Sequence, residues 1–261
     1  NIGGSGSLGS GTYAGDITNS GTFTYASSTA QTLSGVISGS GALTKSGSST
    51  LTLSGTNTYS GDTTISAGAI TVSGLLGNGT YAGGISNAGT LTLSSSSAQT
   101  LSGAISGSGG ITKSGSGNLT LSGSSNFTGA IALSNGTLIA GADNALGSSP
   151  TITASNTPTF KTTSGTTLPS ISVTGDVILE SSVKTTGAQT YNDNVTVKGT
   201  GFSLITSNNN ITIGGNLAAY NISGILQLRY NGKYVFNSAS EATASGSSTS
   251  VGNGSLTYSS S

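Results

Sequence analysis

Apolar residues alternate with threonine or serine along almost the whole chain. The pattern reads Leu-Thr-Leu at 51–53, 91–93 and 119–121, and Ile-Thr-Ile at 211–213. Alternation with a period of two residues is typical of a β-strand with one buried face. Glycine, serine or asparagine bounds nearly every run, and no segment has the 3.6-residue period of an amphipathic helix. We therefore expect an all-β protein with short strands.

The predicted strands recur at a nearly constant interval of about 20 residues, the size of one rung of a parallel β-helix. Two aliphatic series show this interval: Leu33, Leu53, Val72 and Leu93, and Leu43, Ile65 and Ile85. We predict a parallel β-helix (a solenoid) with rungs of about 20–22 residues. The aliphatic residues of each series should stack along one axis inside it.

A long internal repeat supports a solenoid. Leu8–Gly74, the first copy, aligns without a gap with Leu76–Ala142, the second copy, and 38 of the 67 aligned positions are identical. Glycines are kept at fixed positions, which indicates corners with positive φ. The length of this repeat should correspond to about three rungs. We expect equivalent residues of the two copies to lie directly over one another.

The regularity of the chain changes near residue 143, and all three prolines follow this point. An Ala-Gln-Thr segment at 188–190 nevertheless repeats those at 30–32 and 98–100. We predict duplicated β-helix repeats at 1–142, a less regular continuation of the same coil at 143–224, and a terminal hairpin with a serine-rich tail at 225–261.

The strongest hairpin signal lies near the end of the chain. Two strand-like runs flank Asn231 and Gly232, a pair typical of a type I′ turn. Arg229 and Lys233 stand beside this turn. An antiparallel hairpin with charges at its tip would protect the open strand edges of a solenoid. We therefore predict a C-terminal cap formed by these four residues.

The composition excludes several functions. Only 5% of the residues are charged, with seven Lys and Arg against seven Asp and Glu, and His and Cys are absent. A basic face for nucleic acid is missing, and so are the usual zinc and copper ligands. We expect no cofactor and no metal. The first residues do not form a signal peptide, and no apolar run approaches the length of a membrane span, so we expect no membrane insertion by this chain.

The acidic residues do not indicate an enzyme. Asp16 and Asp62 are not kept in the second copy. Asp176 and Asp193, separated by slightly less than one rung, are the acids most suited to meet across neighbouring rungs. A general acid and base pair would need two such carboxylates in a groove, and a Ser-His-Asp triad is impossible without His. We expect no catalytic residues.

Lys45 and Lys113 are the only charges that the two copies share. They are candidate surface contacts, either as cations that face a ligand or as solvated lysines that limit sideways sheet association. We favour solvated lysines. Aromatic residues kept between the copies should pack in the core or at turns, and they are the pairs Tyr13/Tyr81 and Tyr59/Phe127.

Thr-x-Thr motifs invite comparison with an ice-binding face, which needs a regular ladder of this motif. They occur at 22–24, 50–52, 90–92 and 151–153. Their spacing along the chain is irregular, so we do not expect such a ladder.

The segment 39–65 closely resembles the autotransporter-associated β-strand repeat, G-x-G-x-L-x-K-x-G-x-G-x-L-x-L-S-G-x-N-x-Y-x-G-x-T-x-I. The second copy matches over 107–133, with Ser125 in place of Asn and Phe127 in place of Tyr. The segment 188–193 is similar to filamentous-haemagglutinin-type adhesins. The resemblance implies a right-handed β-helix exported to the surface of a Gram-negative-type bacterium, where the repeat assists secretion and folding of the passenger.

Two hypotheses follow. The first is a non-enzymatic rod, extracellular or on the cell surface, that acts as an adhesin or as a passenger stalk and contacts a host or bacterial surface ligand. The second is a subunit of an extracellular filament or sheath that stacks end to end with other copies of itself. A polysaccharide-active enzyme is a distant third.

Overall fold

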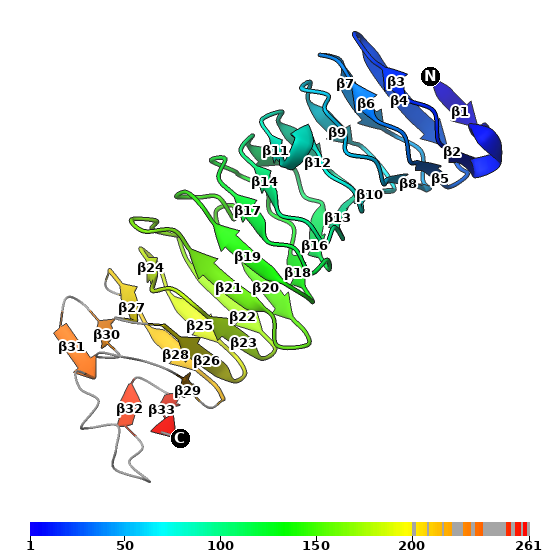
Figure 1. Cartoon of the computed structure of the whole chain (residues 1–261). Helices are drawn as coiled ribbons and strands as arrows, with labels where there is room; N and C mark the ends of the chain where they lie inside the picture. The colour runs from blue at the N-terminus through cyan, green and yellow to red at the C-terminus, as the bar shows by residue number, and fades with distance from the viewer. Residues whose placement is uncertain are drawn as a thin grey trace.

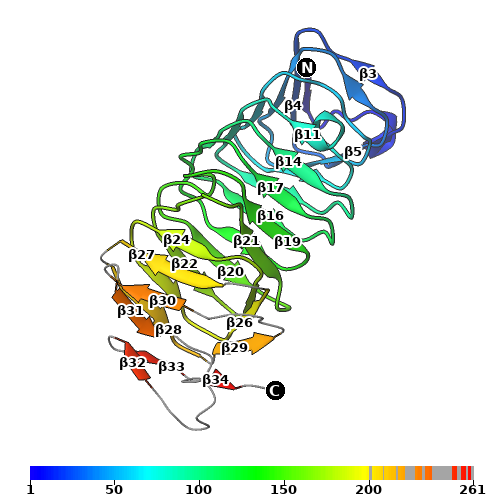
Figure 2. The same cartoon turned by 60° about the vertical axis from the view of Figure 1, so that its left-hand side comes forward.

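The computed structural model is an elongated stack of coils in which each turn of the chain lies on the one before it (Figure 1). The structure describes residues 1–199, 202–207, 209–215 and 217–220, together with short strands at 227–230, 233–236, 249–251, 254–256 and 258–259. Figure 2 shows the same rod from a second side, with strands of successive turns lying side by side along its length.

Three long sheets run along the rod. The largest has eleven strands: β2 (Thr12–Tyr13), β5 (Gln31–Leu33), β8 (Thr50–Leu53), β10 (Ala69–Val72), β13 (Thr90–Leu93), β16 (Gly110–Lys113), β18 (Ile131–Leu133), β20 (Thr151–Ala154), β22 (Ile171–Thr174), β25 (Gln189–Tyr191) and β28 (Ile211–Ile213). Each turn adds one strand to this sheet, so the eleven strands correspond to ten turns. All their pairings are parallel.

The other two long sheets form the remaining sides. The six-stranded sheet contains β1 (Ile2–Gly4), β4 (Thr22–Ser27), β7 (Ala42–Lys45), β9 (Thr63–Ile65), β12 (Ile85–Asn87) and β15 (Ile105–Ser106). The nine-stranded sheet contains β11 (Thr80–Tyr81), β14 (Gln99–Leu101), β17 (Leu119–Leu121), β19 (Thr137–Ala140), β21 (Thr159–Thr162), β23 (Val177–Leu179), β26 (Val195–Lys198), β29 (Leu217–Tyr220) and β34 (Tyr258–Ser259). From β11 to β17 the chain visits the nine-, six- and eleven-stranded sheets in turn.

Smaller sheets complete the described chain. They are β3 (Ile17–Thr18) with β6 (Ile37–Ser38), β24 (Val183–Thr185) with β27 (Ser203–Thr206), β30 (Gln227–Tyr230) and β31 (Lys233–Phe236), and β32 (Thr249–Val251) with β33 (Gly254–Leu256). The helical segments among the described residues are two 3₁₀ turns, η1 (Gly9–Gly11) and η2 (Gly77–Gly79). No helix in this part of the chain is long and apolar enough to cross a membrane.

The register of the strands confirms one predicted core series and corrects the other. Leu33, Leu53, Val72 and Leu93 stack in register inside the eleven-stranded sheet. Leu43, Ile65 and Ile85 do not form one column: Leu43 and Ile85 both stack on Thr63, whereas Ile65 stacks on Lys45. A shift of two residues keeps the same side chains facing inward, so the alternation could not distinguish the two registers.

The coil continues past residue 143, where the sequence becomes less regular, as predicted. β18 pairs with β20 and β19 with β21, so two sheets cross this point without interruption. The boundaries of the predicted parts, at 142/143 and 224/225, stay predictions. Further on, β30 and β31 pair antiparallel around the predicted turn. Asn231, Gly232 and the side chains of Arg229 and Lys233 lie outside the described residues, so their role as a cap also stays a prediction.

The core is a narrow column of aliphatic and aromatic side chains enclosed by the three sheets. Inward residues such as Leu51, Ile70 and Leu138 are fully buried, whereas the threonines between them face outward. A rung buries too few apolar groups, at about 1.5–3 kcal/mol each, to offset the entropy of ordering about 20 residues. Each rung is therefore stabilised by its neighbours.

Candidate functional site

Lys45 and Lys113 do not lie on the surface. The side chain of Lys45 is 0% exposed and that of Lys113 is 2% exposed. The expectation of a surface contact, whether to a ligand or to solvent, is therefore wrong. Both lysines occupy inward positions of their strands, β7 and β16, and Lys113 stacks between Leu93 and Leu133. The aliphatic stem of each lysine fills the apolar column, and the ammonium group reaches a corner of the coil.

Carbonyl oxygens of the corner hold both ammonium groups. Lys45 donates to the carbonyl of Gly47, and Lys113 donates to the carbonyls of Gly115 and Asn135, the latter at 3.0 Å. Burial lowers the pKa of both lysines, because the charged form loses water that the carbonyl dipoles replace only in part. The ammonium groups thus hold the backbone of the corner with charge-assisted hydrogen bonds.

A glycine on the next rung makes room for each ammonium group. Gly68 and Gly136 both have a φ of +68°, in the left-handed region. A Cβ atom on Gly68 would lie 2.9 Å from Lys45 Nζ, and one on Gly136 would lie 2.7 Å from Lys113 Nζ. Glycine is needed at both positions for two reasons: it adopts the left-handed conformation at low cost, and it leaves room for the ammonium group. Each lysine and the glycine about one rung after it form one structural unit, which we call the Lys-Gly corner.

Buried amide side chains join successive rungs in the same way. Asn57 accepts a hydrogen bond from the Ile37 N–H at 2.9 Å and donates to the carbonyls of Gly55 and Leu75. Ser125, its equivalent in the second copy, accepts from Ile105 N–H at 3.0 Å. Gln31 and Gln99 each bond both the N–H and the carbonyl of a leucine about one rung earlier, Leu8 and Leu76. These side chains supply hydrogen bonds to backbone groups at places where strand pairing does not supply them.

Three of the four aromatic residues kept between the copies are core residues, as predicted, and the fourth, Tyr13, is partly buried against the core. Tyr59, Tyr81 and Phe127 are at most 2% exposed, and the rings of Tyr59 and Tyr81 meet edge to face at 5.4 Å. The hydroxyl of Thr63 lies 2.8 Å from both phenol oxygens. Burial is the main cause that raises the pKa of Tyr59, and it also raises that of Tyr81.

The acidic residues hold backbone amides at exposed corners. Asp16 accepts from Val36 N–H, and Asp62 accepts from Gly84 N–H, each at 2.7 Å. The structure brings Asp176 and Asp193 to neighbouring corners, as their spacing predicts. Asp193 accepts from Gly175 N–H at 2.7 Å, and Asp176 accepts from the backbone and side chain of Asn194. No group of three potential metal ligands occurs in the described part of the chain.

A wide cleft of about 470 Å³ lies at the corner between β21 and β24. Several of its polar side chains have partners at the corner. Thr163 and Thr166 hydroxyls lie 2.8 Å apart, and Glu180 forms an ion pair with Lys161 at 3.0 Å. Thr162 donates to the Ser182 carbonyl at 2.7 Å. These contacts stabilise the corner.

The threonine ladder is more regular than expected. Six successive strands of the eleven-stranded sheet place a threonine in register on the outer face: Thr12, Thr32, Thr52, Thr71, Thr92 and Thr112. The expected irregularity is wrong here because the rung interval, and not the order of strands in the sequence, sets which residues align. The neighbouring column reads Thr50, Ala69, Thr90 and Gly110, so the paired array needed by an ice-binding face is interrupted.

Comparison with known protein families matches residues 43–72 and 111–140 to the passenger-associated-transport-repeat. The chain carries two of these repeats. They are consistent with an autotransporter passenger β-helix, as the sequence resemblance implied, and they imply a cell-surface or secreted protein. Neither the curated proteins nor the solved structures contain a match to the chain.

Each passenger-associated-transport-repeat corresponds to four strands. The first covers β7 to β10, and the second covers β16 to β19. Both contain a buried lysine, the glycine of its corner, and the Asn or Ser that joins two rungs. These residues of the two repeats therefore act inside the coil.

The two repeats lie on different sides of the rod. Lys45 is in the six-stranded sheet, whereas Lys113 is in the eleven-stranded sheet, and the other three strands of the repeat change sheet in the same sense. Three turns of the coil use most of the length of one copy, and the remainder advances the chain by one side. The expectation that equivalent residues lie directly over one another is wrong, because one copy spans three turns and a third.

Sequence reasoning missed the coupling between Tyr59 and Thr63. A signal for it exists in the duplication. The second copy has Phe127 and Ile131 at these two positions, so both hydroxyls are lost together. Replacing both partners of a buried hydrogen bond by apolar groups is far less costly than replacing one. Paired changes between internal copies thus identify side chains in contact.

Proposed function

We propose that the chain is a shaft segment in the passenger of an autotransporter, displayed on the outer surface of a Gram-negative-type cell. In this function it acts without catalysis, as the stalk of an adhesin that holds a binding part away from the membrane. Two passenger-associated-transport-repeats in a continuous parallel solenoid support this proposal. Ten turns at about 4.8 Å each give a shaft of about 48 Å.

The position of the shared residues is the observation that carries the proposal. A repeat that recognises a ligand would place its equivalent side chains in line on one exposed face. Here the shared lysines are buried and lie in different sheets. Because the second copy is rotated, equivalent outward residues such as Thr44 and Thr112 also lie in different sheets, as expected of a repeat selected for folding and stiffness and not for one binding face.

Surface display tests the proposal. The full chain with an N-terminal epitope tag would be expressed in a Gram-negative host as the passenger of an autotransporter translocation unit. We expect antibody to label intact cells and external protease to remove the label. Detection of the tag only after the outer membrane is permeabilised, with the translocation unit inserted, would overturn it. Turnover of any member of a polysaccharide panel by the purified chain would overturn the non-catalytic role.

A filament or sheath subunit is the second candidate, and the charge of the outer surface favours it. Residues 1–142 contain four charged side chains, of which the two lysines are buried. Only Asp16 and Asp62 remain outside in this part, so rods experience little mutual repulsion. Negative-stain microscopy of the purified chain separates the candidates, because a stalk gives single short rods and a filament subunit gives long fibres that grow with concentration.

A further inference from the structure

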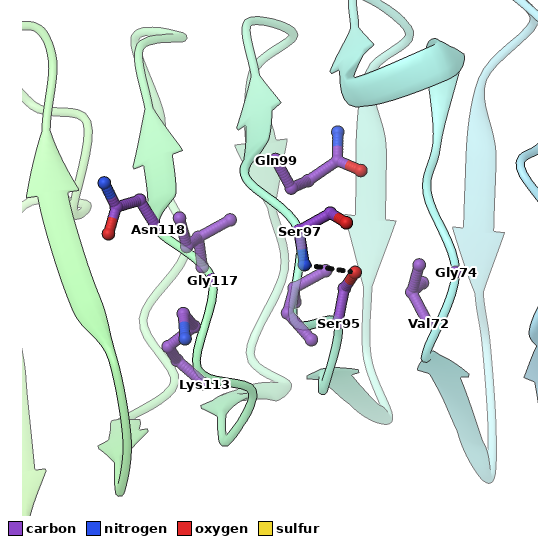
Figure 3. Close-up of a pocket in the computed structure, with 10 residues that line it drawn as sticks. Val72, Gly74, Ser95, Ser97, Gln99, Lys113, Gly117 and Asn118 are labelled. Carbon is purple, nitrogen blue, oxygen red and sulfur yellow. Dashed lines mark hydrogen bonds between the residues drawn. The ribbon is translucent and has the colours of Figure 1, made fainter.

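A small cavity of about 10 Å³ lies beside the second Lys-Gly corner, between the turns that carry β10, β13 and β16. Figure 3 shows the residues around it, with Lys113 on one side, Gln99 on another and the Ser95–Ser97 turn between them. Leu93 and Gly117 also line the cavity. The volume is close to the minimum that holds one water molecule.

The first copy shows what fills this space when the residues differ. Tyr25 stands at the position of Leu93, and its phenol donates a hydrogen bond to the carbonyl of Thr29. Its ring centroid lies 5.7 Å from Lys45 Nζ, close enough for a cation–π contact. Ser49, in place of Gly117, donates to the Ser27 carbonyl at 2.7 Å. The first corner is therefore closed by side-chain atoms.

The second copy has lost both of these groups. Leu93 has no phenol, and Gly117 has no hydroxyl. The carbonyl of Ser97, equivalent to that of Thr29, thus lacks the donor that Tyr25 supplies in the first copy. Lys113 has three N–H donors, of which Gly115 and Asn135 accept two. The third has no hydrogen-bond acceptor within the described residues.

We propose that this cavity binds one ordered water molecule, which accepts a hydrogen bond from Lys113 Nζ and donates one to the Ser97 carbonyl. The water replaces the phenol oxygen of Tyr25. Lys113 and Ser97 both line the cavity, and an ammonium donor together with a carbonyl acceptor matches a molecule that both accepts and donates. A metal cation is repelled by the ammonium group, and an organic ligand is too large. The two corners therefore hold their lysines differently, the first by an aromatic ring and the second by water.

A crystal structure of the full chain, at a resolution that shows water, tests the proposal directly. We expect one density peak within hydrogen-bond distance of both Lys113 Nζ and the Ser97 carbonyl oxygen. Crystals grown with bromide in place of chloride distinguish water from an anion. An anomalous peak at the site, or a site without density, would overturn the proposal.

Two reciprocal variants test whether the side chain at the position of Tyr25 and Leu93 decides if a water is bound. In the double variant Tyr25→Leu with Ser49→Gly we expect a new ordered water beside Lys45, because these two changes give the first corner the side chains of the second. In Leu93→Tyr we expect the water to be absent and the new phenol to donate to Ser97. If Leu93→Tyr does not fold, the wild type and the double variant still decide the matter. A structure of the double variant without water at Lys45 contradicts the proposal.

Discussion

The Lys-Gly corner gives a sharp prediction about stability, using the substitution Gly136→Ala. Gly136 has a φ of +68°, where an L-residue costs about 1–2 kcal/mol. Its added Cβ would lie 2.7 Å from Lys113 Nζ and from the Gly115 carbonyl oxygen, and 2.8 Å from the Ser116 carbonyl oxygen. Relieving such overpacking costs about 1–3 kcal/mol. We expect a total loss of about 2–5 kcal/mol in the free energy of unfolding.

Gly21→Ala is the matched control within the same chain. A Cβ on Gly21 meets no atom within 4 Å, and its φ is not in the left-handed region. Alanine there should leave stability within about 0.5 kcal/mol of the wild type, or raise it slightly by restricting the unfolded chain. The two variants differ from the wild type by the same methyl group, so the difference between them reports the corner alone.

The assay is urea unfolding followed by far-ultraviolet circular dichroism and by tyrosine fluorescence. We expect Gly136→Ala to lower the urea midpoint and the melting temperature, the latter by roughly 4–20 °C at about 2–4 °C per kcal/mol. Equal stability of Gly136→Ala and Gly21→Ala would refute the reasoning. A double variant with Lys113→Met shows how much of the loss comes from the ammonium contact, because the left-handed strain stays while that contact disappears.

Three further predictions concern the other buried polar groups. Tyr59→Phe and Thr63→Val should each lower the free energy of unfolding by about 1–2 kcal/mol. The double variant should lower it by only about 1 kcal/mol, since the second copy lacks both hydroxyls. Additive losses in a double-mutant cycle would contradict the shared hydrogen bond. Asn57→Leu should cost about 1–3 kcal/mol, because it leaves the Ile37 N–H unpaired and removes one of the two hydrogen bonds to each of the Gly55 and Leu75 carbonyls. Asn57→Ser should cost less than about 1 kcal/mol, because Ser125 fills the role in the second copy; equal losses in thermal unfolding would argue against this. Burial raises the pKa of Tyr59 and Tyr191 in the fold, so their contribution to stability is complete below the ordinary tyrosine pKa near 10 and is lost as the pH rises through the folded values. The chain has nine tyrosines, so absorbance at 295 nm is compared between the wild type and the variants Tyr59→Phe and Tyr191→Phe. The part of the signal that a variant lacks should rise only together with loss of circular dichroism, and its appearance near pH 10 with the fold intact would exclude burial of that tyrosine. The two buried lysines shift stability in the opposite direction over this range, because their folded pKa is lowered, so tyrosine absorbance is the appropriate readout.

The architecture could be derived from local patterns. Alternation at Leu51–Leu53 fixed which side chains face inward, because successive residues of a strand point to opposite faces. The constant interval between Leu33, Leu53 and Val72 fixed the rung, because strands that stack in parallel must repeat with the length of one turn. Repetition of the long G-x-G-x-L-x-K motif then predicted the repeat family.

The candidate site could not be derived in the same way. Lysine at position 45 is charged, and its strand-end position suggested solvent, yet the fold surrounds its stem with apolar neighbours and offers carbonyl oxygens to its ammonium group. Which carbonyls converge on it depends on Gly68, a full rung away, and on the path of the corner between them. The contact of Lys45 with Gly47 is local, but its contact with Gly68 joins residues more than one rung apart, so no local pattern contains the whole corner.

The orientation of the two repeats also needed the tertiary structure. The sequence alone determined that the chain is a parallel coil of short strands with a long internal repeat. Whether the length of that repeat closes a whole number of turns depends on the exact length of each rung, which varies slightly at the corners. Three rungs, from Thr12 to Thr71, take fewer residues than one copy, and the remaining residues carry the chain on by a third of a turn, so the second repeat is rotated by one side of the rod.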